Sequence, residues 1–364
     1  MTSELQAIEA LVASASAAAA EGRWEAAAGQ WHQAAAVGRS RKAHRSAAMC
    51  AEQEGECWRR ADHAIHAEAA LQQALGQPEP PADPVATFAR LAAVLGERGA
   101  GRRALAVGRQ AVHMAEQTGS PSAPIARDTL VGLLQGFGRK EEQRPLVEAL
   151  AASLGDDAPS VAFRRGQLLR LDGRLEQADE AFASVEERLA GVSGAEAGVA
   201  GARMERAEIG MLQGRTSGAV DAFMAARSLH EGAGRRSLSW RCEVGRVRAS
   251  VRVGLPPVAP GLDEARRWAM ARGLELLAVD LRTAAGLCQV GHDPAAAEAH
   301  LTASAAAADE MGCLPRVGRI HLHLLSHVAT DASTRAAWAQ AAREGLADNV
   351  PLLREVEALL TRSP

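Results

Sequence analysis

The feature that most constrains the fold is a short pattern that recurs along the chain and is clearest at residues 162–185. Leu168, Leu169 and Leu171 form the apolar side of one amphipathic helix. Apolar side chains at steps of three and four residues over 175–185 predict a second helix. Gly173 lies between them, and glycine readily adopts the left-handed conformation that ends a helix. The segment therefore predicts a helical hairpin, two antiparallel helices joined by a tight turn.

Similar hairpins can be traced along most of the chain. The alanines that follow their turns are Ala27, Ala67, Ala104, Ala178, Ala219 and Ala296. Their positions recur at multiples of roughly 35–41 residues, within the range of structural repeats. The Pro-rich segments 78–84 and 255–261 interrupt the pattern and predict loops. We therefore expect an all-α repeat protein of about eight or nine hairpins.

Three segments carry a resemblance to a known family. They are Gly22–Ala34 with two tryptophans, Gly55–Ala74, and Gly166–Phe182. Their order of small, apolar or aromatic, and alanine positions resembles the tetratricopeptide repeat (TPR). The chain departs from that family in a spacing longer than the usual 34 residues or so. The aromatic residue near the end of the first helix is also usually replaced by Leu, Ala or Gly.

The resemblance implies a right-handed α-solenoid with a concave face built from the first helix of each hairpin. Residues 1–364 would form a single TPR-like solenoid. Within it we expect four segments, namely N-terminal hairpins at 3–79, central hairpins at 80–235, irregular C-terminal hairpins at 236–346 and a capping helix at 347–364.

Composition narrows the class of protein. The net charge is −3, which gives no global field for nucleic acid or an anionic membrane. Only Lys42 and Lys140 are lysines, and this excess of arginine is typical of a GC-rich bacterial genome. The five cysteines are scattered, no apolar stretch is long enough for a membrane span, and the N-terminus lacks a signal-peptide pattern. We expect a cytoplasmic bacterial protein without membrane insertion.

By analogy with the repeat, several side chains of the first helices face a partner. The predicted partner-binding residues are Arg59, Arg90, Arg164, Gln167, Arg170, Met204 and Arg282. Guanidinium forks suit carboxylates, so an acidic peptide or a C-terminal carboxylate is a possible ligand. The alternative is that these arginines are solvated surface. The carboxylate clamp known in the family is disfavoured, because it needs Asn and Lys and the only asparagine is Asn349.

Other chemistry-bearing groups have simpler explanations. Cys50, Cys57, His63 and His66 could only bind zinc if they converged tetrahedrally, and buried cysteines with surface histidines are favoured. His323 and His327 lie four residues apart without the glutamate of a zinc-protease motif, and we expect surface histidines. The basic run 39–45 is expected to be a charged loop.

The chain shows no phosphate-binding loop after a strand, no nucleophile elbow and no isolated carboxylate pair. We therefore expect no catalytic residues, metal or cofactor, and predict a non-enzymatic scaffold or adaptor that binds a peptide or protein. Two alternatives stay open. One is a ligand- or peptide-sensing regulatory module, and the other is a self-assembling structural protein that forms homo-oligomers.

Overall fold

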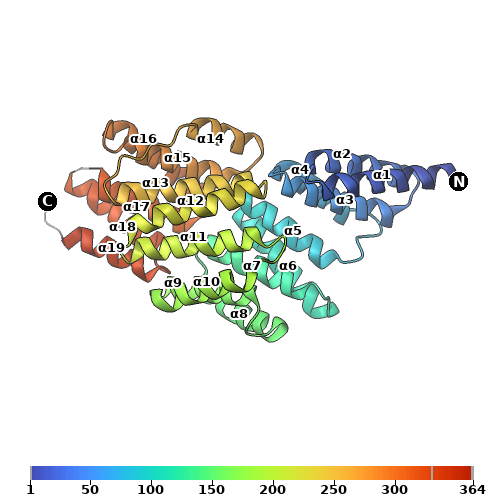
Figure 1. Cartoon of the computed structure of the whole chain (residues 1–364), viewed down its shortest axis with the longest axis horizontal. Coiled ribbons are helices and arrows are strands. Elements are labelled where there is room, and N and C mark those ends of the chain that lie inside the picture. The colour runs from blue at the N-terminus through green and yellow to red at the C-terminus, as the bar shows by residue number, and fades with distance from the viewer. Residues whose placement is uncertain (1, 329–330, 362–364) are drawn as a thin grey trace. The chain divides into compact units, whose positions relative to one another are not determined.

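A computed structural model describes residues 2–328 and 331–361. All regular secondary structure in these ranges is helical, in agreement with the predicted fold class (Figure 1). The helices are α1 (Thr2–Ala20), α2 (Trp24–Ser40), α3 (His44–Arg60), α4 (Ala64–Leu75), α5 (Pro84–Glu97), α6 (Gly101–Thr118), α7 (Ala123–Gly136), α8 (Lys140–Leu154), α9 (Pro159–Leu171), α10 (Leu175–Leu189), α11 (Glu196–Leu212), α12 (Thr216–Gly232), α13 (Arg236–Arg252), α14 (Leu262–Ala271), α15 (Glu275–Gln289), α16 (Pro294–Glu310), α17 (Leu314–His327), α18 (Ala332–Gly345) and α19 (Val350–Thr361).

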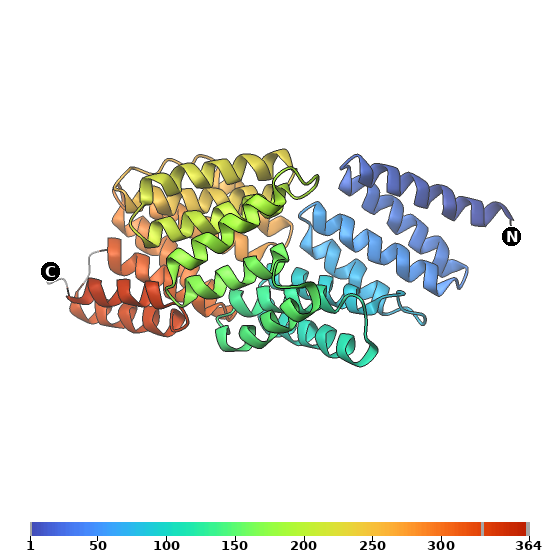
Figure 2. The same cartoon turned by 60° about the horizontal axis from the view of Figure 1, so that its bottom comes forward.

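Most helices pack against the next one in the chain as antiparallel hairpins, whereas α13 packs on α15 and not on α14, and Figure 2 shows the arrangement within each part of the chain. By its contacts the chain divides into two compact units. Unit 1 comprises Met1–Leu133 with Arg272–Leu274, and unit 2 comprises Leu134–Ala271 with Glu275–Pro364. The predicted segments 3–79, 80–235, 236–346 and 347–364 stay a prediction.

One turn geometry recurs at many of the connections. The residue after the turn donates its backbone N–H to the carbonyl five residues earlier, as in Arg23 to Ala18 at 2.9 Å and Arg174 to Leu169 at 2.9 Å. This bond satisfies a carbonyl that the end of a helix leaves open. The turn needs one residue with positive φ, which is Gly173 (78°) in the second example.

The connection between α2 and α3 has this same turn, with Lys42 at a φ of 58° in place of glycine. Ala43 donates to the carbonyl of Gly38 at 2.9 Å. The predicted loop over residues 39–45 is therefore too long, because α2 extends to Ser40 and α3 starts at His44. Without a glycine, the sequence carried no signal for this turn.

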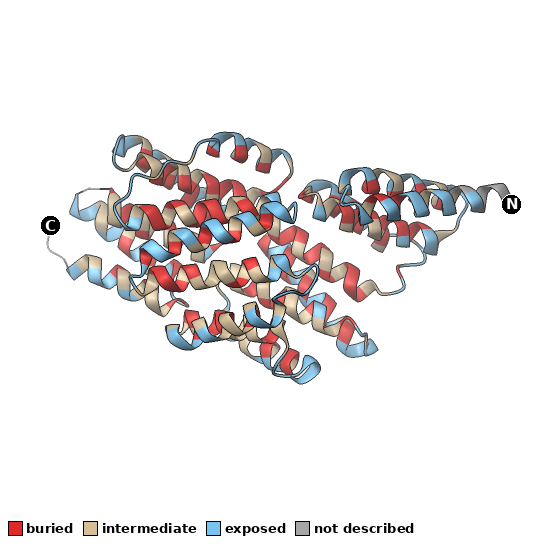
Figure 3. Ribbon diagram, viewed as in Figure 1, coloured by how far each residue is buried: buried red, intermediate tan, exposed pale blue. Residues whose placement is uncertain are grey.

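Within the hairpins, a small residue of the first helix allows close packing of a large one from the second. A Cβ atom on Gly166 would lie 2.9 Å from the ring of Phe182, and one on Gly55 would lie 2.7 Å from Leu71. Phe182 and Leu71 are fully buried. Buried residues accordingly run along the facing sides of neighbouring helices (Figure 3). Each such side chain contributes roughly 1.5–3 kcal/mol through burial.

Helix α19 lies within the expected capping segment 347–364, but it does more than cover the end of the stack. Besides α18, it packs against α9 and α17, the first helices of their hairpins. The Arg252 side chain of α13 lies 2.9 Å from Glu355 of α19. Just before α19, a carboxylate oxygen of Asp348 accepts the backbone N–H of Lys140 at 2.9 Å. Within unit 2, α19 thus lies on the inner side formed by first helices.

Candidate functional site

The first-helix surface of unit 1 is formed by neighbouring faces of α3 and α5. Arg59 pairs with Glu56 of its own helix at 2.8 Å. Arg90 of α5 reaches across to Glu52 and lies 3.8 Å from Glu56. Burial alone would raise the pKa of Glu56, but the surrounding arginines outweigh it and lower the pKa to about 2. Glu56 is therefore ionised at neutral pH.

An apolar side chain accompanies these charges. Met49 precedes Glu52 by three residues and Glu56 by seven, so all three lie on one side of α3. Met49 is 46% exposed, which is high for a large apolar residue. Together Met49, Glu52, Glu56, Arg59 and Arg90 form the α3–α5 face, a surface of mixed charge with an exposed thioether.

The other predicted partner-binding residues lie in unit 2. Arg164 donates to Gln167 at 3.0 Å, and Gln167 donates to Glu205 of α11 at 2.7 Å. Arg170 is buried, with its Nε atom 3.0 Å from Glu205. The structure thus brings two predicted residues of α9, Gln167 and Arg170, onto Glu205, and Arg164 joins them through Gln167. Met204 and Arg282 lie partly buried on α11 and α15.

A cavity of about 260 Å³ lies inside unit 2 among α9, α11, α13, α17 and α19. Its apolar wall consists of Met211, Leu212, Val251, Leu322, Leu352 and Leu359. The polar part of the lining consists of arginines, glutamates, histidines and one serine. Of the predicted partner-binding residues only Arg170 lines this cavity. The first helices of unit 2 therefore line a small, partly open cavity, with α19 as one wall.

The charges of the cavity are matched in pairs with one exception. The pairs are Arg170 with Glu205 at 3.0 Å, Arg248 with Glu208 at 2.6 Å, and Arg252 with Glu355 at 2.9 Å. Arg319 of α17 also lines the cavity, but it makes no hydrogen bond or ion pair with any residue in 2–328 or 331–361. Burial would raise the pKa of Glu208, yet Arg248, Arg319 and Arg170 lower it to about 2.

Two histidines complete the polar wall, whereas the sequence led us to expect surface histidines. His323 and His327 follow Arg319 at intervals of four residues, and all three line the cavity. The Nε2 atom of His323 is buried without a hydrogen-bond partner in the described chain. Burial, together with Arg248 and other nearby cations, holds its pKa well below the usual value. The imidazole is therefore neutral at physiological pH.

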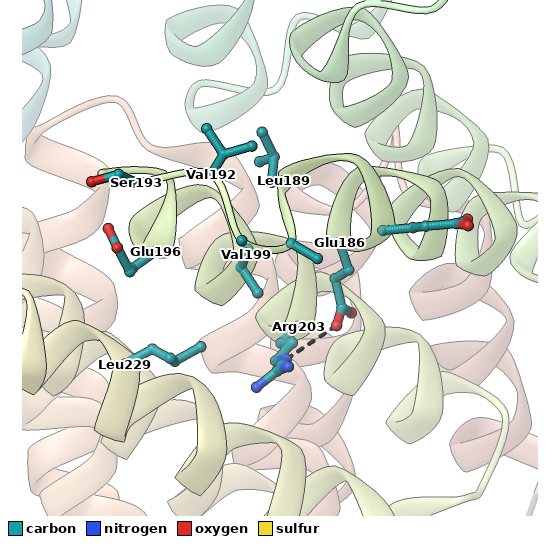
Figure 4. A pocket seen from close by; sticks show the side chains of 11 residues that line it. Glu186, Leu189, Val192, Ser193, Glu196, Val199, Arg203 and Leu229 are labelled. Atoms are coloured by element: carbon teal, nitrogen blue, oxygen red, sulfur yellow. Dashed lines mark hydrogen bonds and ion pairs between the residues drawn. The ribbon is translucent and has the colours of Figure 1, made fainter.

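A second hollow, of about 680 Å³, lies beside the loop between α10 and α11 (Figure 4). Leu189, Val192 and Val199 form its apolar part. Its arginine, Arg203, is already paired with Glu186 at 3.0 Å, as the dashed line in Figure 4 shows. This hollow leaves no buried charge uncompensated, in contrast to the cavity.

The residues considered for zinc are separated by the packing of α3 and α4. Cys50 and Cys57 are buried in the core of unit 1. His63 and His66 stack on each other with ring centroids 4.1 Å apart, beside Trp58. Among the described residues no three His, Cys, Asp or Glu side chains are grouped to hold a metal ion.

Comparisons with known proteins show the fold. A Rap protein complexed with competence and sporulation factor superposes with a TM-score of 0.50, at 13% identity over 72% of this chain and 76% of that chain. The APC/C hetero-tetramer Cut9–Hcn1 gives 0.50 at 11% identity over 97% and 75%. A monomeric IFIT1 mutant with m7Gppp-AAAA gives 0.50 at 13% identity over 95% and 79%. The chain is a TPR-like α-solenoid.

This TPR-like assignment comes from structure, since no family model and no curated protein sequence matches the chain. At these identities the likeness concerns the fold alone. None of the helices in the described part of the TPR-like chain is long and apolar enough to cross a membrane.

Sequence reasoning missed most of the cavity. It did not single out Arg248, Arg252 or Arg319, nor the apolar wall from α19. A signal was present, because Arg319, His323 and His327 form a stripe at four-residue steps along α17. A polar stripe along the first helix of a late hairpin predicts side chains that face inward. Which residues face that stripe depends on the other four helices.

Proposed function

We propose that the protein is a non-enzymatic scaffold that binds a segment of a partner protein on the α3–α5 face of unit 1. The observation that carries the proposal is the combination of paired charges with an exposed Met49 on adjacent first helices. Methionine adapts to varied apolar partners, and rim charges give specificity. The TPR-like fold supports a role in protein–protein interaction.

An acidic partner segment must compete with the glutamates already present on this face. Arg59 and Arg90 are each paired with Glu56 or Glu52. Partner carboxylates would take over these guanidinium groups while an apolar side chain covers Met49. These ion pairs are only partly buried, so salt still screens their exchange with partner carboxylates, and the complex should weaken as the salt concentration rises.

Site-specific photocrosslinking tests the location. A photoreactive amino acid replaces Met49 in one variant and exposed His113 of α6 in another. We expect the first variant, irradiated in lysate of the native cell, to crosslink a discrete protein, and the second to give none. Equal crosslinking from both positions, or none from position 49, would contradict docking at this face.

A charge exchange tests recognition without breaking the ion pair. The double variant Glu52→Arg with Arg90→Glu keeps opposite charges in contact but reverses their order. We expect this variant to lose capture of the partner protein while its melting temperature stays unchanged. The control Arg102→Glu, at an exposed position of α6, should capture the partner normally. Normal capture by the exchanged variant would exclude a role for these charges.

The reducing cytoplasm of a bacterium is the location we propose. All five cysteines are free, and four of them are buried. Burial raises the thiol pKa of Cys50 and Cys57 to about 11, so neither is a reactive thiolate at neutral pH. A ligand-sensing role has separate support in the cavity of unit 2. Homo-oligomerisation stays an expectation.

A further inference from the structure

Four arginines and two glutamates line the cavity of unit 2, and a third glutamate, Glu205, pairs with Arg170 from outside the lining. Arg170, Arg248 and Arg252 each have a glutamate partner, whereas Arg319 has none among the residues that the structure describes. A guanidinium without an anion in direct contact is costly in partly buried surroundings, and the carboxylate that attracts Arg319, Glu208, is already paired with Arg248. A bound monoanion would bring the local charge to zero.

The helix α19 limits what can enter. It packs on α9 and α17, and its Leu352, Glu355 and Leu359 side chains form one wall of the cavity. An extended peptide that ran along the inner side of unit 2 would collide with this helix. The remaining space, about 260 Å³, is below the usual range for drug-sized ligands. The occupant must therefore be small.

We infer that this cavity binds a carboxylate carried on a short apolar chain, with Arg319 as its anchor. The planar guanidinium can donate two parallel hydrogen bonds to the two carboxylate oxygens. The apolar tail would lie against Leu212, Leu322 and Leu352, which form part of the apolar wall. This site does not depend on the proposed docking face, which lies in unit 1.

The acidic residues of the cavity favour a single negative charge over a phosphate dianion. Glu208 and Glu355 both line the space, and both would repel a second charge. The Nε2 atom of neutral His323 lacks a partner and can donate one further hydrogen bond when it carries the proton. A monoanion with an apolar tail would bind Arg319, accept the hydrogen bond of His323 and leave no net charge in the site.

The protonation of Arg319 is consistent with this inference. Burial, followed by repulsion from Arg248, lowers its pKa to about 10 despite the attraction of Glu208. The group remains charged at neutral pH, so it can still bind an anion. Its lowered pKa reflects the same excess of positive charge that the ligand would neutralise.

Calorimetric titration of the full-length protein tests the inference with defined probes. The probes are hexanoate, uncharged hexanamide, and inorganic phosphate, with the melting temperature as a second readout. We expect hexanoate to bind and to raise the melting temperature, because a ligand of the folded state stabilises it. Hexanamide and phosphate should do neither. Binding of hexanamide as tight as that of hexanoate, or no binding of hexanoate, would overturn the carboxylate site.

The variant Arg319→Gln separates recognition from folding. Removing an unpaired charge should leave the melting temperature of the ligand-free protein equal or higher. Loss of a charge-assisted pair should weaken hexanoate binding by about 10- to 100-fold. The matched control is Arg354→Gln, an exposed arginine of α19 outside the cavity, which should bind as the wild type does. Unchanged binding by Arg319→Gln would exclude this anchor.

Two sources of the carboxylate can be told apart. A free acid and the C-terminus of a protein chain share the same chemistry. A short apolar peptide with a free C-terminus is therefore titrated beside its amidated form. Binding of hexanoate alone identifies a small-molecule site, and binding of the free but not the amidated peptide identifies a chain end. Equal binding of both peptide forms contradicts recognition of the carboxylate.

Discussion

His230 of α12 has 1% of its surface exposed, and neither ring nitrogen has a hydrogen-bond partner in the described chain. Burial, with smaller contributions from Arg235 and Arg241, lowers its pKa to about 4. The unfolded chain binds a proton near pH 6.5, well before the folded chain does. The neutral His230 ring therefore contributes its full share to the free energy of unfolding above pH 6.5, and this share is lost as the pH falls toward 4.

We expect the free energy of unfolding to fall by about 3 kcal/mol through His230 between pH 7 and pH 4. Urea unfolding at a series of pH values measures it. In His230→Leu the dependence on pH should be shallower by that amount, while His113→Leu, at an exposed position, should keep the wild-type slope. Identical slopes in wild type and His230→Leu would show that this ring does not titrate as described.

Lys42 gives a second prediction at this scale, because its φ of 58° is unfavourable for a side chain with a Cβ atom. Lys42→Gly should stabilise the protein by about 0.5–1 kcal/mol, as relief of strain exceeds the added flexibility of the unfolded chain. The reverse change Gly214→Ala, at a φ of 77° with open space around it, should destabilise it. Thermal unfolding of both variants checks the pair, and a destabilised Lys42→Gly would refute the strain.

Prediction at the residue scale succeeded where the residue type by itself determines the local conformation or the local packing. Gly173 ends α9 as expected, and Gly166 lies against Phe182 as the repeat pattern implies. It failed at Lys42, where tertiary packing imposes a glycine-like conformation on another residue. It also failed at His323, because an isolated histidine on a helix carries no sign of what it faces.

Helices α17 and α18 cross at Gly318 and Gly345. A Cβ atom added to Gly318 would lie 2.7 Å from the backbone carbon of Gly345, so neither helix could yield without moving its main chain. Gly318→Ala should cost about 2–3 kcal/mol. A Cβ atom added to Gly218, an exposed position of α12, would contact nothing. Gly218→Ala should therefore stabilise the protein by about 0.5–1 kcal/mol. Chemical denaturation compares the two, and equal effects would argue against the close crossing.

The bounds of the elements were largely predictable, whereas the position of α19 was not. Helix α19 falls inside the expected capping segment 347–364, and the apolar periodicity that indicates a helix there is local. Its packing on α9 and α17 depends on pairs far apart in sequence, such as Arg252 with Glu355. No periodic pattern encodes such a contact, and the cavity wall therefore remained hidden.

At the scale of the whole molecule, each unit has its own buried core, and we expect local effects of core substitutions. Leu71→Ala should increase amide hydrogen exchange in α1–α6, and Leu281→Ala should do so in α15 and its neighbours. Both leucines are fully buried, and each change should cost about 2–5 kcal/mol. Exchange read by mass spectrometry measures this. Uniform acceleration throughout the chain in either variant would show that the two units unfold as one.

The packing of α19 against α9 and α17 also has a consequence for folding during translation. The arginines and histidines of the cavity belong to α9, α13 and α17, which leave the ribosome before residues 350–361. Until then these charges face water, and the cavity lacks one wall. Because chains fold from the N-terminus as they emerge, the last helix is the step that converts an open hydrated surface into a partly enclosed site. A carboxylate ligand would therefore distinguish chains that have packed α19 from shorter nascent ones.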